Sequence, residues 1–94
     1  MITSEEDFAV RLAQAQAGLA RLLAGDPDNA ALLSAQRQLE HVAQWTRAGA
    51  RPTPAQREQL SFGLIAAREI EPLDLPLAEQ LHELSYHLQG RPRG

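Results

Sequence analysis

Apolar residues recur every three or four positions along most of the chain, the spacing that gathers side chains on one face of an α-helix. The first such stripe is formed by Phe8, Leu12, Ala15, Leu19 and Leu22. Two later stripes are formed by Leu32, Ala35, Leu39 and Val42, and by Leu77, Leu81, Leu84 and Leu88. The sequence lacks the period-two alternation that indicates β-strands, and β-branched residues are few. It therefore predicts an all-α fold without a β-sheet.

Capping residues, prolines and glycines divide the chain into predicted helices. Ser4 and Asp7 have the spacing of a capping box, and Gly25 stands where a left-handed C-terminal cap is expected. Asp26-Pro27 and Thr53-Pro54 each combine an N-cap residue with a proline at the first helical position. The predicted helices span about residues 4–24, 27–48, 54–70 and 76–89, and a frayed tail follows at 90–94. Because short connections make neighbouring helices antiparallel, we expect one domain over residues 1–94, a small antiparallel four-helix bundle or a close variant.

Composition excludes several classes of function. The 94 residues suit one domain, and they include no cysteine, which excludes disulfides, thiolate zinc sites and thiol catalysis. The net charge of −3 argues against nucleic acid and anionic membranes as partners, because both bind clustered positive charge. The acidic N-terminus carries no apolar export signal, and no apolar run is long enough to span a membrane. We therefore expect a cytoplasmic protein.

The histidines and hydroxyl residues do not form a recognisable catalytic or metal-binding motif. The segment from His82 to His87 resembles the HExxH zinc motif but is one residue too long. On a helix these two side chains diverge by roughly 140°, so they cannot share a metal ion without ligands from elsewhere. No combination of serine, histidine and acid suggests a hydrolase. We expect neither a metal nor a cofactor, and we expect that the protein is not an enzyme.

Two groups of residues are candidates for contact with a protein partner. Glu69, Glu71 and Asp74 form an acidic run between the third and fourth predicted helices, which we expect to carry charge without a local counter-charge; it is either a solvated turn or a docking patch. Trp45 lies just off the apolar stripe of its helix, beside His41 one turn earlier. It is either the edge of the core or an exposed anchor.

Further positions off the main stripes add to this interpretation. Tyr86 is a second aromatic residue that could anchor a partner. Gly63, Ala66 and Ala67 form a small-residue face that favours close packing between helices, and no strand precedes it, which excludes a phosphate-binding loop. If the chain is instead a self-associating adaptor, this face and Trp45 would form the seam of a homodimer.

Two segments resemble a known family. They are Leu-Leu-Ser-Ala-Gln-Arg-Gln-Leu at residues 32–39, and Leu-Ser-Phe-Gly-Leu-Ile-Ala-Ala-Arg-Glu-Ile at residues 60–70, with Asp74 and Leu77 downstream. Their order and spacing resemble the immunity proteins cognate to type VI secretion effectors, typified by the one that neutralises an NAD(P)+ glycohydrolase toxin. The resemblance covers about residues 28–90. The first predicted helix shares only its apolar pattern, and the linker at 47–54 is longer here.

The resemblance implies a stoichiometric inhibitor that stays in the producer's cytoplasm and performs no chemistry. Such a protein binds the toxin domain and covers the cleft where the nucleotide enters. The alternative to an NAD(P)+ glycohydrolase is another nucleotide-consuming toxin, such as an ADP-ribosyltransferase or a (p)ppApp synthetase. We expect the free chain to be a monomer or a weak homodimer; the alternative function is a small helical adaptor or self-associating structural domain. The residues expected to contact the toxin are Glu69, Glu71, Asp74, Trp45, His41 and Tyr86.

Overall fold

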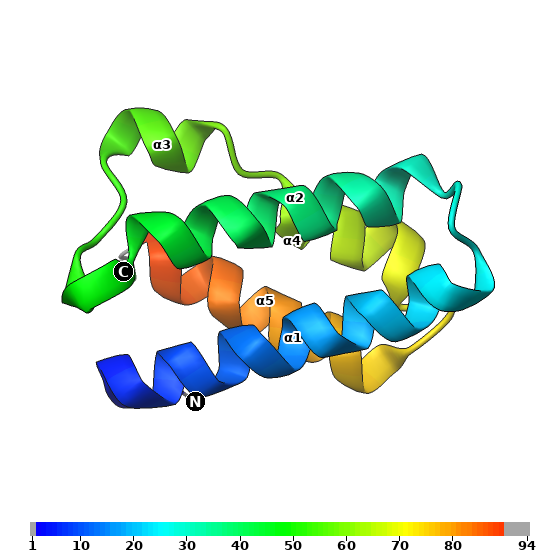
Figure 1. Cartoon of the computed structure of the whole chain (residues 1–94), viewed down its shortest axis with the longest axis horizontal. Coiled ribbons are helices and arrows are strands. Elements are labelled where there is room, and N and C mark those ends of the chain that lie inside the picture. The colour runs from blue at the N-terminus through cyan, green and yellow to red at the C-terminus, as the bar shows by residue number, and fades with distance from the viewer. Residues whose placement is uncertain (1, 90–94) are drawn as a thin grey trace.

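The computed structural model describes residues 2–89, which form helices and connecting turns and contain no β-strand. Three long helices dominate it: α1 (Glu5–Gly25), α2 (Ala30–Trp45) and α5 (Leu75–Gln89). Figure 1 shows α1 and α2 side by side and antiparallel, and α5 running back against α1. The prediction of an all-α fold is confirmed, and the predicted frayed tail at 90–94 lies outside the described residues.

Four short helical segments connect α2 to α5. They are η1 (Arg47–Gly49), α3 (Pro54–Glu58), α4 (Phe62–Ile65) and the π-helical η2 (Ala66–Ile70). The pair α4–η2 takes the place of a fourth long helix, because α4 packs against both α2 and α5. On the other side of the bundle, α1 packs against the same two helices. None of the helices in residues 2–89 is long and apolar enough to cross a membrane.

The core lies where the apolar stripes of the helices meet. All the predicted stripe positions of α2 and of α5 are buried, as the spacing requires. On α1 the stripe ends in Leu23, whereas the predicted Leu22 is only partly buried against the core. Phe62 and Ile70 at the two ends of the α4–η2 segment are fully buried, and they fix this segment onto the bundle.

The start of α2 differs from the prediction. The helix begins at Ala30 rather than at Pro27, and its N-cap is Asn29, whose Oδ1 accepts the backbone N–H of Leu32 at 3.1 Å. Asp26 instead ends α1 and donates its backbone N–H to the Leu23 carbonyl at 3.1 Å. The predicted left-handed cap at Gly25 is therefore wrong, since the positive-φ glycine of the described residues is Gly49.

The predicted continuous helix over residues 54–70 is also wrong, because the chain breaks between α3 and α4. At the break, the N–H of Ser61 donates to Oε1 of Gln38 at 2.7 Å, and Nε2 of Gln38 donates to Oγ of Ser61 at 3.0 Å. The first of these bonds satisfies the backbone N–H of Ser61, which a continuous helix would have used, and the second holds the Ser61 side chain against α2. After the break, the N–H of Glu71 reaches the carbonyl of Ala66 at 2.9 Å, which gives the π-helical turn.

The small-residue face brings α4 close to α5, as predicted for helix–helix packing. A Cβ atom at Gly63 would lie 2.8 Å from Oγ and 3.1 Å from Cβ of Ser85. Ala66 is fully buried, while Ala67 is exposed. Since Gly63 and Ala66 pack within the chain, they do not supply the homodimer seam that the alternative interpretation required.

We expect Gly63→Leu to destabilise the fold by about 1–3 kcal/mol, because the added side chain overpacks the contact between α4 and α5. Gly25→Leu is the matched control: no atom lies within 4 Å of a Cβ there, so it should be neutral or slightly stabilising. Urea unfolding of both variants and the wild type measures the difference. Equal stabilities of the two variants would contradict the close packing described here.

Candidate functional site

The structure divides the predicted contact residues between two ends of the bundle. Glu69, Glu71 and Asp74 lie on and after η2, at the turn into α5, and we call them the acidic turn. His41 and Trp45 lie in the last turns of α2 and Tyr86 lies in the last turn of α5; we call this group the aromatic end. Figure 1 places the turn between η2 and α5 at the right, and the ends of α2 and α5 at the left.

Two members of the acidic turn have partners within the chain. Oδ1 of Asp74 accepts the N–H of Leu77 at 3.1 Å, which caps the first turn of α5. Oε2 of Glu71 lies 3.0 Å from Nε2 of His82, which belongs to α5. The expectation of an acidic run without a nearby opposite charge is therefore wrong for Glu71 whenever His82 is protonated. Glu69 is exposed.

The acidic turn also carries apolar surface. Leu73 and Leu75 flank Asp74 and are 60% and 51% exposed. Half-exposed leucines beside carboxylates form a mixed surface of the kind found where proteins bind one another, with apolar contact area inside a charged margin.

At the aromatic end, Trp45 belongs to the edge of the core. Its side chain is partly buried against the core, and its ring stacks on that of the exposed His41 with centroids 5.7 Å apart. Tyr86 is 65% exposed on α5. Each of these two aromatic residues directly precedes a residue that lines a pocket, Thr46 and His87 respectively.

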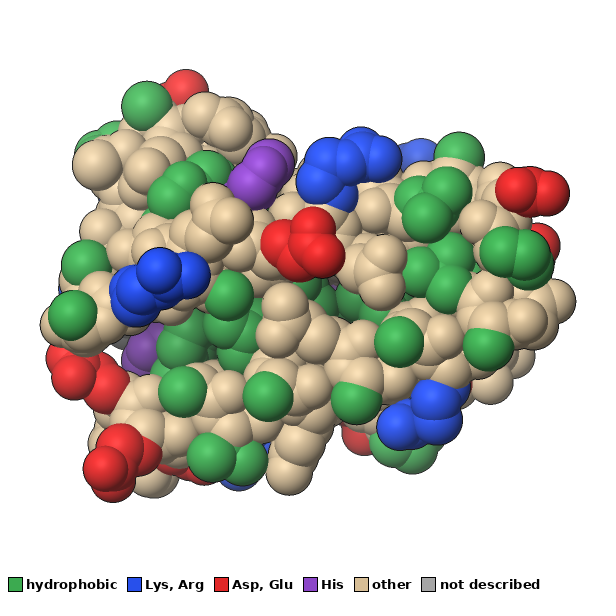
Figure 2. All heavy atoms as spheres, viewed as in Figure 1, with side chains coloured by type: hydrophobic (Ala, Val, Ile, Leu, Met, Phe, Trp, Pro, Cys, Tyr) green, Lys and Arg blue, Asp and Glu red, His purple; other side chains and the backbone are tan. Residues whose placement is uncertain are grey.

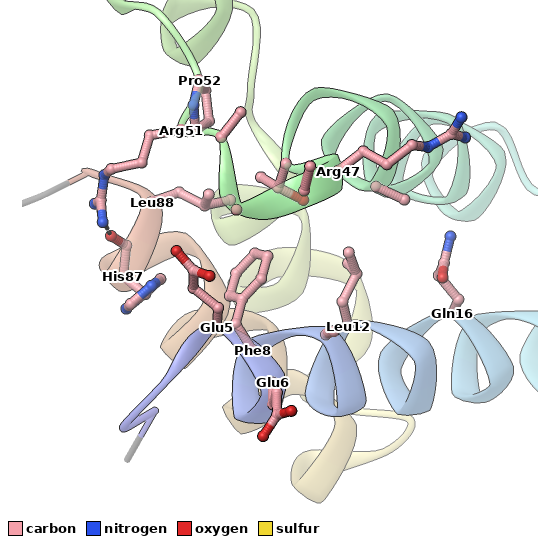
Figure 3. Close-up of a pocket in the computed structure, with 16 residues that line it drawn as sticks. Glu5, Glu6, Phe8, Leu12, Gln16, Arg47, Arg51, Pro52, His87 and Leu88 are labelled. Carbon is pink, nitrogen blue, oxygen red and sulfur yellow. Dashed lines mark hydrogen bonds between the residues drawn. The ribbon is translucent and has the colours of Figure 1, made fainter.

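This pocket, of about 460 Å³, opens between the start of α1, the chain from the end of α2 to Pro52, and the last turn of α5. Its floor is apolar, because Phe8, Leu12 and Leu88 are buried beneath it. Figure 3 shows Phe8 and Leu12 rising into the space from α1. In Figure 2 it is the hollow at the left, between the start of α1 and the end of α2. Its exposed rim carries Glu5, Glu6, Arg47 and Arg51.

The loop that forms one wall of the pocket has an unusual backbone. Ala48 and Gly49 have positive φ angles of 60° and 81°. A Cβ atom at Gly49 would also lie 2.7 Å from both carboxylate oxygens of Glu5, so this exposed side chain would have to move. Nη2 of Arg51 then donates to the backbone carbonyl of His87 at 3.3 Å and joins the loop to the end of α5.

His87 closes the pocket from α5. Its ring stacks on Phe8 with the centroids 5.2 Å apart. Burial lowers the pKa of His87 below its ordinary value of 6.5, and the charge of Arg51 lowers it further. The wall next to Phe8 is therefore uncharged at neutral pH.

This pocket was not predicted from the sequence. Its lining comes from three separate segments of the chain and includes residues that were interpreted as a linker. The visible signals were Gly49 and the arginines around it. Within residues 2–89, no three histidine or acidic side chains gather closely enough to hold a metal ion. The pocket therefore offers an apolar floor and a charged rim, which suit binding.

A family model described as Tsi6 matches residues 6–89, which include the acidic turn and nearly all of the pocket lining. The chain belongs to the Tsi6 family. It is therefore an immunity protein of type VI secretion, which is not an enzyme, and its partner is a cognate toxin. No curated protein and no solved structure matches this Tsi6-family chain.

The lowered pKa of His87 gives this Tsi6-family chain an acid dependence of stability. As the pH falls through about 6.5, the unfolded chain takes up a proton at His87 while the native chain does not, so the free energy of unfolding falls. Urea unfolding at about pH 7.5 and about pH 5.5, on either side of the ordinary histidine pKa, measures this loss. We expect His87→Gln to lose less stability between these pH values than the wild type, and the exposed-site control His41→Gln to behave as the wild type. Equal acid dependence in the two variants would contradict the assignment to His87.

Proposed function

We propose that this immunity protein inhibits a toxin that consumes a cytosolic nucleotide, an NAD(P)+ glycohydrolase in the first instance, by covering the cleft where the nucleotide enters. The membership in the Tsi6 family carries the proposal, and the two segments at 32–39 and 60–70 support the choice of toxin. Inhibition of this kind needs no chemistry from the inhibitor. It takes place in the producer's cytoplasm, where the nucleotide pool is.

Tight binding is a requirement of this role, since a small free fraction of toxin would be harmful. A dissociation constant in the nanomolar range corresponds to about −12 kcal/mol. An interface of standard size covers about 800 Å² on each partner, roughly one seventh of the 5625 Å² surface of this chain. One continuous face is therefore sufficient for inhibition.

The exposed carboxylates of the acidic turn support the proposal that this turn attracts the toxin. A cleft that binds the phosphates of a dinucleotide has a positive potential, which attracts a protein of net charge −3. Glu69 and Glu71 are exposed on a turn, where their charge reaches an approaching partner. Leu73 and Leu75 add apolar contact area beside them. Asp74 contributes indirectly, because it fixes the start of α5.

The first test is an inhibition assay with a candidate toxin domain, which is sought first in the gene immediately upstream of this chain. We expect the consumption of NAD(P)+, followed by nucleotide absorbance, to fall linearly and to stop at one immunity protein per toxin, because a tight inhibitor titrates its target. Parallel assays of ADP-ribosyl transfer and (p)ppApp synthesis distinguish the other two toxin classes. A toxin that stays fully active in a large molar excess of the chain would contradict the proposed function.

The second test reverses the charge of the acidic turn. We expect Glu69→Arg combined with Glu71→Arg to slow association with the inactivated toxin domain at least about tenfold at low salt, because exposed charges act mainly on the rate of encounter. The difference should shrink at high salt, where charges are screened.

The matched control is Glu40→Arg combined with Glu58→Arg, which makes the same charge change at exposed positions of α2 and α3. Biosensor association rates and a toxin pull-down provide the measurements, and circular dichroism verifies that both double variants are folded. Association as fast as that of the control, or undiminished capture of the toxin, would exclude the acidic turn from recognition.

A further inference from the structure

The rim of the pocket at the start of α1 carries charges of both signs above an apolar floor. Its two carboxylates, Glu5 and Glu6, come from α1, and its two guanidinium groups, Arg47 and Arg51, come from the facing loop. Glu5 and Glu6 have no ion pair with the described residues, whereas Arg51 already bonds the end of α5. The charges balance in number, so the rim favours neither a purely cationic nor a purely anionic partner.

The pocket walls are preformed. The loop keeps Ala48 at a φ of 60°, a left-handed conformation that is costly for a residue with a Cβ atom. Hydrogen bonds hold it there, because the N–H of Gly49 donates to the Thr46 carbonyl at 3.1 Å and the N–H of Ala50 to the Arg47 carbonyl at 3.3 Å. A preformed pocket loses less conformational entropy when a partner binds, so more of the contact energy appears as affinity.

The floor suits an apolar side chain. Phe8, Leu12 and Leu88 lie beneath the opening, and the His87 ring stacked on Phe8 is uncharged at neutral pH. The volume of about 460 Å³ lies within the range of about 300–1,000 Å³ of pockets that enclose a ligand. Protein interfaces concentrate their binding energy where a large side chain fills such a pocket and a charged rim excludes water.

We propose that this pocket receives a large apolar side chain, carried on a loop of the cognate toxin whose neighbouring residues have charges of both signs. A basic neighbour would pair with Glu5, and an acidic neighbour would pair with Arg47. The inference rests on the proposed function and adds the anchoring contact to it. His41, Trp45 and Tyr86 do not line this pocket, and the acidic turn lies at the other end of the bundle.

The experiment uses the absence of cysteine from the chain. Ala9 is exposed on α1 and lines the pocket, whereas Ala13 is exposed one turn later on α1 and does not line it. Ala9→Cys and Ala13→Cys are purified and folded first, and each is then coupled to a fluorescein maleimide. Since each variant is compared before and after labelling, the measurement isolates the effect of filling the pocket.

We expect the labelled Ala9→Cys protein to bind the inactivated toxin domain at least about tenfold more weakly than the same protein without label. The labelled Ala13→Cys protein should bind as its unlabelled form does. A second variant, Arg47→Glu, should also weaken binding, because it reverses the charge of one of the two guanidinium positions on the rim. Circular dichroism verifies that each protein is folded.

Each other outcome overturns the inference. Equal binding by labelled and unlabelled Ala9→Cys would show that the toxin does not use the pocket, even if inhibition by the wild type upholds the proposed function. A change in sedimentation on labelling, without a change in toxin affinity, would assign the pocket to a second copy of this chain. If the wild type fails to bind any of the toxin classes assayed, the proposed function itself is wrong.

Discussion

The contact of α5 with its two neighbours is the constraint on which the rest of the structure depends. Its leucine stripe packs against α1 on one side and against α4–η2 on the other, and a glycine marks each close approach. A Cβ atom at Gly18 would lie 2.8 Å from a methyl group of Leu77, and one at Gly63 would lie 2.8 Å from Oγ of Ser85. Because α5 is fixed along its length, its first turn positions the acidic turn and its last turn forms a wall of the pocket.

The local signals in the sequence were sufficient for the long helices and insufficient for the segment between them. The period of the apolar residues predicts α1, α2 and α5, since an apolar stripe needs only one face to pack against. The capping pattern misplaced the start of α2, whose N-cap is Asn29. The break before α4 depends on Gln38, whose side chain bonds Ser61 from 23 residues away. Tertiary hydrogen bonds of this kind override helix propensity, and a pattern along the chain does not reveal them.

The site was partly predictable for a similar reason. Residue type identified exposed acids and an aromatic residue at the edge of the core, but it did not show that Glu71 would meet His82 across a turn. The pocket is less visible still, because its lining comes from three segments brought together by the fold. The chain after α2, which the sequence analysis interprets as part of a linker, forms a wall of the pocket, where Gly49 lies against the carboxylate of Glu5.

The two ends of the bundle suit different parts of one binding process. An exposed ion pair contributes at most about 1 kcal/mol, since water and salt already screen its charges. The net charge of −3 therefore does not by itself provide a nanomolar affinity, although under the proposed function it would accelerate the encounter with a cationic cleft. Filling an apolar pocket contributes about 25 cal/mol for each Å² removed from water, and an aromatic side chain buries about 150–250 Å². Under the proposed function, an inhibitor as small as this one needs that contribution, and the proposed anchor in the pocket between α1 and the end of α5 would supply it.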